Sequence, residues 1–509
     1  MMNKFSLFVF FSIFSTTLMA QMSSDALLFS ERIQPNTARS LAVGGALGAL
    51  GADMSSLNGN PAGLAVYRGA EFSISPGLQF ANIKSQFLAD STLPRSSNNR
   101  LSFNMGSVGL VLANEQSTDW RFVNFGISFG KIASFNRTYS FSGTSTGSRI
   151  INFTQEANAA NAVPDDLDPF EERLAWDAYF IDNPGGGTDY VGSVVDSNRA
   201  YIQKSQLVRQ SGGINELNIA LAGNYKNKLY IGGSLGITFL NFRDFRSYSE
   251  TEPTGNMDFK SLNFDEIRTV RGTGINLKLG LIYRVNKRLR VGLNMHTPTA
   301  MSLTENLDTE LSGAVVWNDT LRETSATEPW VSPTAEYKQD FFSPWVFALS
   351  MGHTFGGKTD PIKGYLGIDG EYLNYAGSSF ALQASDENAT AGDQAFIDAV
   401  NNAIVDTYQG AYRLRVGGEL AIKTLRLRAG YRLQSSPYLD QVQGVDDLRH
   451  DISAGIGFRQ EHIFFDLSYM RTIRDFEYSP YYATSIYNNP RTSNSETVGL
   501  FMMTLGFRF

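Results

Sequence analysis

The run LYIGGSLGITF at residues 229–239 shows most directly what kind of fold this chain adopts. Large apolar side chains stand at nearly every second position, and small or polar ones lie between them. One face comprises Leu229, Ile231, Leu235, Ile237 and Phe239, and the other comprises Tyr230, Gly232, Ser234, Gly236 and Thr238. Alternation over this length indicates a β-strand whose two faces meet different surroundings.

Two nearby segments show the same pattern with charged residues on the polar face. Lys278 stands among leucines in residues 275–283, and Arg290 and Asn294 do so in residues 289–296. Burying an unpaired charge in a dry core is costly, so these residues fit a wet interior opposite a lipid face. We therefore predict an all-β fold, a transmembrane antiparallel β-barrel.

About 14 such segments follow one another from residue 72 to the C-terminus. Short connections, such as Asn227-Lys228 and Gln460-Glu461, alternate with long ones along the chain. The long connections surround residues 84–100, 146–200, 249–264, 311–339, 378–408, 437–448 and 477–494. Outer-membrane barrels have short periplasmic turns and long extracellular loops, so we expect both chain ends in the periplasm. Helical spacing at residues 393–408 predicts one amphipathic helix within a long loop.

The first residues predict export. Lys4 precedes an apolar stretch from Phe5 to Leu18, and a small residue, Ala20, follows, which is the pattern of a signal peptide over residues 1–20. The formal charge of -7 argues against a nucleic-acid partner, which would favour a basic face. Cysteine is absent from the sequence, which excludes disulfides and thiol chemistry.

Residues 21–70 do not alternate and are rich in small residues. They contain Gly44-Gly45-Ala46, Gly51-Ala52-Asp53 and the triplet Asn60-Pro61-Ala62. Small residues permit tight turns and close backbone packing, which a compact plug inside a barrel requires. We therefore expect a hatch over residues 21–70 and a barrel over residues 71–509.

This N-terminal stretch resembles the hatch of the FadL/TodX-type family of outer-membrane transporters for long-chain fatty acids and aromatic hydrocarbons. The triplet Asn60, Pro61 and Ala62 matches the hatch motif of that family. Residues 290–298 and 427–437 are similar to its barrel segments, especially in members from Bacteroidetes. The chain ends on Phe509 in the lipid-facing phase, which resembles the signal read by the barrel-assembly machinery of the outer membrane.

The resemblance implies a 14-stranded monomeric barrel in contact with outer-membrane lipids. Hydrophobic small molecules, fatty-acid-like or aromatic, would be captured at the extracellular loops and would diffuse passively past the hatch. They would leave sideways through a gap made by an irregular strand. The alternatives are a secretion-system accessory of the same barrel type and a heme-binding barrel that uses a histidine such as His296.

Two strand segments lose their alternation at a glycine. The apolar phase slips at Gly106-Ser107, and it breaks after Gly130 at Lys131. A slip at glycine indicates a β-bulge, which bends a strand. We propose that one of these sites lies at the lateral opening, with an ordinary barrel bulge as the alternative.

Several other motifs do not indicate a catalytic or metal site. Two G-x-S-x-G strings, at residues 126–130 and 232–236, lie inside alternating segments and not at the strand-to-helix elbow that a nucleophile needs. The four histidines show no metal-ligand spacing. An acidic cluster around residues 165–172 is explained by a solvated loop, with a calcium site as the alternative. We therefore expect no enzyme activity, no cofactor and no metal.

Overall fold

The chain forms a closed antiparallel barrel of 14 strands in the computed structural model. The structure describes residues 16–32, 37–90, 92–194, 201–255, 257–357, 359–383, 390–439, 448–481 and 490–509. Residues 1–15, most of the expected signal peptide, lie outside these ranges. The predicted fold class and strand number are confirmed. Within the described ranges, no helix combines the length and the apolar character needed to cross a membrane.

The strands follow one another round the barrel in chain order, and β1 closes it by pairing with both β2 and β22. The wall consists of β1 (Glu71–Phe87), β2 (Ser96–Glu115), β3 (Trp120–Ser134) continued by β4 (Arg137–Ser145), β7 (Ile202–Tyr225), β8 (Leu229–Thr251), β9 (Phe259–Arg284), β10 (Leu289–His296) continued by β11 (Ala300–Trp317), β14 (Ala335–Phe342) continued by β15 (Val346–Phe355), β16 (Ile362–Asn374) followed by β17 (Ser379–Leu382), β18 (Gly410–Ile422), β19 (Leu425–Gln434), β20 (Arg449–Arg459), β21 (Ile463–Tyr478) and β22 (Thr492–Arg508).

The predicted alternation sets the two faces of the wall. On β8, Ile231 and Phe239 are exposed on the outside, whereas Ser234 between them is buried in the interior. The interior is polar in places: Lys278 on β9 and Glu216 on β7 are both fully buried and form an ion pair. An apolar exterior round a partly charged interior is the arrangement of membrane barrels.

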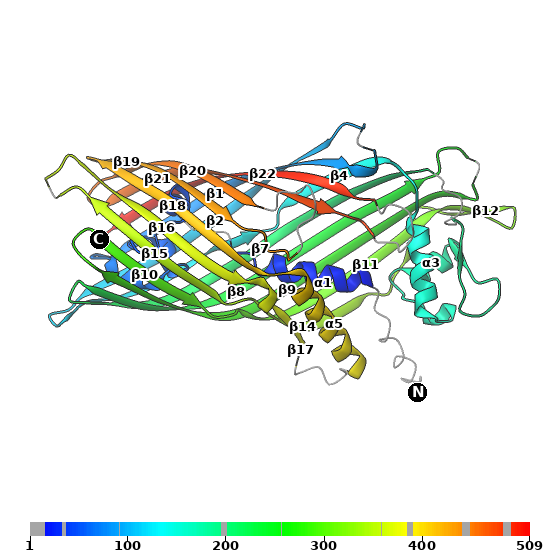
Figure 1. Cartoon of the computed structure of the whole chain (residues 1–509), viewed down its shortest axis with the longest axis horizontal. Helices are drawn as coiled ribbons and strands as arrows, with labels where there is room; N and C mark the ends of the chain where they lie inside the picture. Colours follow the sequence, from blue (N-terminus) through cyan, green and yellow to red (C-terminus); the bar gives the residue numbers. More distant parts are fainter. Residues whose placement is uncertain are drawn as a thin grey trace.

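The two ends of the barrel differ. The C-terminus lies at the end where the short turns join the strands, and Phe509 pairs there with Ala70. The opposite end, called the far end below, carries the short strands β12 (Thr320–Thr324) and β13 (Trp330–Val331), which both pair with the end of β11. It also carries the two-residue strands β5 (Ile181–Asp182) and β6 (Val191–Gly192), and helix α3 (Figure 1).

The helices are few and lie in the interior or in the long connections. They are α1 (Thr16–Phe29), α2 (Ala38–Ala42), α3 (Arg149–Ala160), α4 (Glu172–Asp177) and α5 (Ala391–Thr407), with short 3-10 turns η1 (Met54–Leu57), η2 (Pro61–Val66), η3 (Leu88–Asp90), η4 (Pro164–Asp166) and η6 (Tyr375–Gly377). The loop helix predicted at residues 393–408 is present as α5. The sequence patterns did not predict α1, α3 or α4.

Candidate functional site in the barrel interior

Three parts of the chain fill the barrel, one after another, from the C-terminal end to the far end. The first is residues 37–66, called the inner segment, which packs against the interior face of the wall. The second is an apolar cluster round α1 at mid-height, called the apolar chamber. The third is the cap, residues 146–194 with α3 and α4, which carries a second apolar cluster at the far end. Figure 1 shows α1 lying along the interior between the C-terminal half and the cap.

The inner segment is a chain of short turns, each started by a polar side chain. Thr37 caps α2, Asp53 caps η1 and Asn60 caps η2, in each case by accepting a hydrogen bond from a backbone N–H two or three residues ahead. The hydroxyl of Thr37 also donates to the Asp53 carboxylate at 2.8 Å. These residue types are favoured caps because their side-chain oxygens satisfy free N–H groups. The caps fold the segment back on itself.

The triplet Asn60, Pro61 and Ala62 sits where the inner segment meets the wall. The Asn60 amide oxygen accepts from the Ala62 N–H at 3.2 Å, and its amide nitrogen donates to the Gly48 carbonyl at 2.8 Å. A longer contact of 3.4 Å reaches the Leu281 carbonyl on β9. Asn60 therefore joins two turns of the inner segment and the barrel.

Glycines on the interior face of the wall make room for this segment. A Cβ at Gly232 would lie 2.5 Å from the Pro61 carbonyl oxygen, and one at Gly280 would lie 2.0 Å from Asn60 Oδ1. Such approaches exclude any side chain at these positions. The same holds at five further positions, and together these glycines form what we call the glycine belt: Gly232, Gly280, Gly292, Gly367, Gly417, Gly430 and Gly455. The sequence carried a signal for the belt, since each glycine interrupts the interior phase of its strand.

A cavity of about 100 Å³ lies between the inner segment and the apolar chamber. Its charged lining has more arginines than carboxylates: Arg32, Arg413, Arg415 and Arg432 against Asp369 and Glu371. Glu371 pairs with both Arg413 and Arg415. Arg432 is already paired with the buried carboxylate of Asp451, so an anionic group in this cavity would meet a surplus of one positive charge, on Arg32.

His296 lines the same cavity, and its Nε2 atom lies 2.8 Å from the Gly59 carbonyl oxygen. The His296 ring is buried, and its Nε2 atom is already within hydrogen-bond distance of the Gly59 carbonyl oxygen. The geometry therefore does not favour His296 as a heme ligand. Within the described residues, no three acidic or histidine side chains converge in a way that could hold a metal ion.

The apolar chamber is built from residues far apart in the sequence. Phe29 of α1 lies edge-on to Phe242 and Phe341, with ring centroids 5.9 and 6.1 Å apart. Met22 and Ala26 pack in the same cluster, and the walls come from interior residues of many strands and from α5. These include Ile132, Phe135, Leu240, Phe242, Val270, Leu303, Phe341, Phe380, Ile397, Val400 and Ile404. Sequence patterns missed this chamber because its members are single interior residues on separate strands.

Gly106, Ser107, Gly130 and Lys131 come together at one corner of the wall. The pairing of β1 with β2 passes from Ser107 to Met105, leaving Gly106 without a partner, and a Cβ at Gly130 would lie 2.0 Å from the Gly106 carbonyl oxygen. The register of β3 against β7 shifts between Lys131 and Ala133. Beyond this corner β3 still pairs with β7, and the side chain of Ile132 joins the apolar chamber.

The far-end part of β2 is separated from its neighbour beyond that corner. The described pairing of β2 with β3 covers only Val108 to Glu115 of β2. Residues 96–107 contact β4 through side chains: Asn98 donates to Ser140 at 2.9 Å and Arg100 to Thr138 at 3.4 Å. In the described part of the chain, no backbone ladder joins these residues to β4.

The acidic cluster of the cap is partly buried, so the expectation of a solvated loop is wrong for Glu172. Asp165 is exposed, but Glu172 is only 3 % exposed, and Glu171 forms an ion pair with Arg149 at 2.8 Å. Burial raises the pKa of the Glu172 carboxyl well above its usual value, and the nearby acids Asp168, Glu156 and Glu171 raise it further.

Comparison with solved structures shows the same fold. A FadL homologue from Pseudomonas aeruginosa superposes with a TM-score of 0.55 at 12% sequence identity, over 94% of this chain and 100% of the other. The toluene transporter TbuX from Ralstonia pickettii gives a TM-score of 0.49 at 13% identity, over 93% and 98% of the two chains. No family model and no curated protein sequence matches this chain.

Proposed function

We propose that this chain, which has the fold of a FadL homologue, is an outer-membrane channel for hydrophobic small molecules. Passive diffusion down a gradient would move the cargo. The C-terminal end would face the periplasm and the far end the exterior, in keeping with the short and long connections. Outer-membrane lipids would contact the apolar exterior, and the exposed Phe509 would serve recognition by the barrel-assembly machinery.

The apolar chamber is the observation that carries this proposal. A barrel interior of this kind is usually polar, yet here a large apolar cluster occupies mid-height. Its occupant is α1, which contributes Met22, Ala26 and Phe29. An apolar molecule that replaced these side chains would bury its surface as they do, at about 25 cal/mol for each Å² removed from water.

The arginine-rich cavity beside the chamber refines the class of cargo. A long apolar chain with an anionic head could place its chain in the chamber and its head near Arg32 and Arg413. This arrangement favours fatty-acid-like cargo over neutral aromatic molecules, which would leave the arginine surplus unused. The inner segment would act as the hatch that separates the cavity from the C-terminal end.

The corner at Gly106 and Gly130 would provide the way out. Residues 96–107 of β2 are joined to β4 by side chains, so an opening there breaks few backbone hydrogen bonds. Lateral exit keeps greasy cargo away from water, whose contact with apolar surface is unfavourable. A secretion accessory of the same fold is the alternative, and the apolar chamber would have no use in it.

The proposal is tested by extracting the native protein gently and identifying co-purified small molecules by mass spectrometry. We expect fatty acids or similar amphiphiles in stoichiometric amounts. Uptake of a radiolabelled long-chain fatty acid should also fall in a strain that lacks the gene and recover on complementation. Protein that is consistently empty, together with unimpaired uptake in the deletion strain, would rule the proposal out.

A further inference from the structure

Within the described residues, the far half of the wall is incomplete between β14 and β21. On this side β16 ends at Asn374, β18 begins only at Gly410, and β19 ends at Gln434, so these strands stop at mid-height (Figure 1). β14 is joined there to the four-residue strand β17. Across the opening, residues 474–478 of β21 have no described ladder partner on the β20 side. We call this opening the window.

Helix α5 closes the window from outside, and α1 lies behind it. Ile397, Val400 and Ile404 of α5 are buried in the same cluster as Met22 and Phe29 of α1. The two helices are in direct contact. At this place side-chain packing replaces the hydrogen-bonded ladder that closes most of the barrel. A packed helix can separate from its neighbour without leaving its own backbone unsatisfied, because its hydrogen bonds are internal.

The described hydrogen bonds of α5 with the wall lie at its C-terminal end and at Asn401. Its C-terminal end is fixed by backbone: the Leu439 N–H donates to the Thr407 carbonyl at 2.9 Å, and Tyr408 forms a bridge with Tyr438. Further along, one side chain ties the helix to β17. The amide of Asn401 accepts from the Phe380 N–H at 2.8 Å and donates to the Phe380 carbonyl at 2.9 Å.

The start of α5 is capped within the helix itself, by reciprocal bonds between Thr390 and Asp393. Rotation about Tyr408 would break the Asn401 pair and separate the apolar contacts, while the helix stayed intact.

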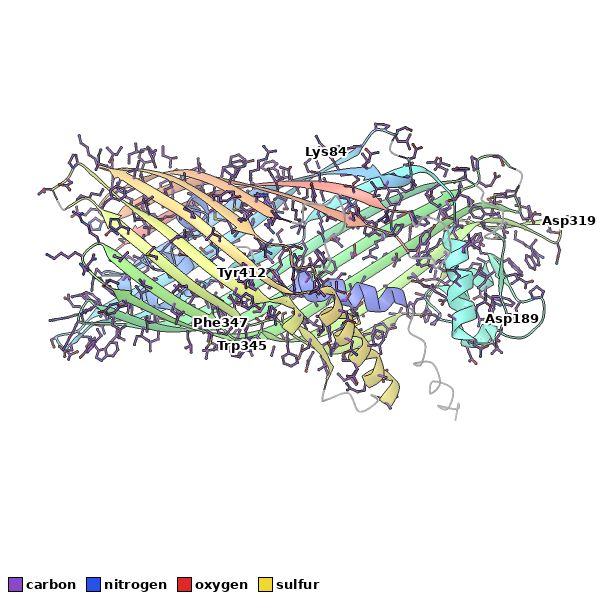
Figure 2. The ribbon with its side chains drawn as sticks, viewed as in Figure 1. Lys84, Asp189, Asp319, Trp345, Phe347 and Tyr412 are labelled. Atoms are coloured by element: carbon purple, nitrogen blue, oxygen red, sulfur yellow. The ribbon has the colours of Figure 1, made fainter. Side chains whose placement is uncertain are left out.

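The window opens at the level of an aromatic girdle. Trp345, Phe347 and Tyr412 are exposed on the outside, and Figure 2 shows them close to α5. Tyr372 packs against Tyr412 with ring centroids 5.2 Å apart. Exposed aromatic rings in such a belt mark the boundary between hydrocarbon and headgroups in membrane barrels. The rim of the window that is nearer the C-terminal end of the barrel therefore lies at the membrane surface, and α5 lies just beyond this rim.

We propose that the window is an entry portal through which hydrophobic molecules dissolved in the outer leaflet reach the apolar chamber. The molecules would be apolar chains or rings with at most one polar head. Helix α5, called the door, would swing aside to open the window. The segment round Tyr408 is the hinge of this movement. Asn401, called the latch, holds the helix closed through its two hydrogen bonds to Phe380. This portal rests on the proposed function and adds a route from the membrane. It lies on a different part of the wall from the corner at Gly106 and Gly130.

The latch can be tested against a neighbouring residue. Asn401 binds β17, whereas Asn402 is exposed on the other side of the same helix. Asn401→Ala should therefore free the door and Asn402→Ala should not. The probe is a palmitate analogue that carries a photoreactive diazirine. It is either dissolved in the lipid of nanodiscs that hold the full chain, or added from water to the chain in a lipid-free amphipol.

We expect Asn401→Ala to raise the rate of cross-linking to residues 22–29 in nanodiscs by about fivefold or more, because both hydrogen bonds to Phe380 are lost. The rate in amphipol should stay unchanged, and Asn402→Ala should match the wild type in both. Asn401→Asp keeps the acceptor and loses the donor, so it should lie between. Because the chain has no cysteine, Ala26→Cys adds a second readout: maleimide should label it faster when the latch is removed.

The outcomes separate the portal from the proposed function. Equal nanodisc rates for Asn401→Ala and Asn402→Ala, with normal cross-linking from water, would refute the portal and leave the function standing. If Asn401→Ala raised the cross-linking rate equally in nanodiscs and in amphipol, the portal would also be refuted. Asn401 would then control access to the whole chamber and not entry from the membrane. Absence of cross-linking by either route in the wild type would refute both. If Asn401→Ala fails to assemble, Asn401→Asp and the labelling of Ala26→Cys decide the matter.

Discussion

The inner segment and α1 fill the same barrel in physically different ways. Wall side chains bind backbone carbonyls of the inner segment: Arg290 donates to Leu50 at 2.9 Å, Asn124 to Leu64 at 2.8 Å and Ser453 to Ala42 at 3.1 Å. Contacts of α1 with the wall run through its side chains, as in the ion pair of Asp25 with Arg268 and the packing of Phe29.

This difference follows from backbone hydrogen bonding. A helix such as α1 satisfies its own carbonyls, whereas short turns leave carbonyls that need partners from the wall. Moving the inner segment would leave these carbonyls buried and unpaired, and moving α1 would not. The inner segment is thus fixed near the C-terminal end, whereas α1 at mid-height can be displaced by a ligand. The predictions below test that contrast, beginning with the largest expected effect.

The glycine belt should be the least tolerant part of the molecule. Gly232→Ala would place a Cβ 2.5 Å from the Pro61 carbonyl oxygen, so we expect a loss of about 3 kcal/mol in the free energy of unfolding, since overpacking against backbone cannot relax. Urea unfolding in lipid vesicles measures it. The control is Gly233→Ala on the next residue, where the nearest atom is 3.7 Å away. Equal stability of the two variants would mean that the inner segment is not held rigidly.

The junction made by Asn60 should come next. Asn60→Ala removes a cap and a donor to the Gly48 carbonyl, so we expect a loss of about 2 kcal/mol and altered fatty-acid uptake in a barrel that still assembles. Asn60→Asp retains the cap and loses the donor, and it should show part of the effect. Heat-modifiable migration on gels reports assembly. If neither variant assembles, the triplet serves barrel folding and not the gating of transport.

The side chains of α1 at mid-height should tolerate truncation better than the inner segment does, and truncating them should change the affinity for a hydrophobic ligand. Phe29→Ala removes a ring from the apolar chamber, so we expect a hydrophobic probe to bind about tenfold more tightly, which corresponds to about 1.4 kcal/mol. Titration with a fluorescent fatty acid measures the change. Phe72→Ala, on the exposed outer face, is the control and should bind as the wild type does. Unchanged or weaker binding by Phe29→Ala would show that α1 does not compete with cargo.

The cap should show the smallest effect, a local dependence on pH. Burial and the neighbouring acid Asp168 raise the pKa of Glu172, so this side chain favours the protonated form when folded. Its contribution to stability is complete at low pH and is lost as the pH rises through the folded pKa. We expect faster proteolysis of the cap at about pH 8 than at about pH 5. Glu172→Gln should reduce that difference, and Asp165→Asn, at an exposed site, should not.

The barrel itself could be predicted from local patterns. Alternation in each strand requires only that one face meets lipid and the other the interior, and this information lies in consecutive residues. The phase slips at Gly106 and Gly130 were visible for the same reason. The helix α5 was predicted because its buried residues recur at helical spacing within one stretch.

The contents of the barrel could not be predicted in this way. Val346 and Phe29 lie far apart in the sequence and meet only when the sheet closes. The belt glycines look like weak points of single strands until a second chain segment packs on them. The window likewise depends on where neighbouring strands end relative to one another.

The sequence by itself therefore determined the wall, because hydrophobic contrast with the membrane acts on each strand separately. Only the tertiary structure decided that, inside the barrel, the inner segment is fixed and α1 can be displaced. That property depends on which backbone carbonyls are satisfied within a segment and which by the wall, and no single stretch of sequence contains both partners.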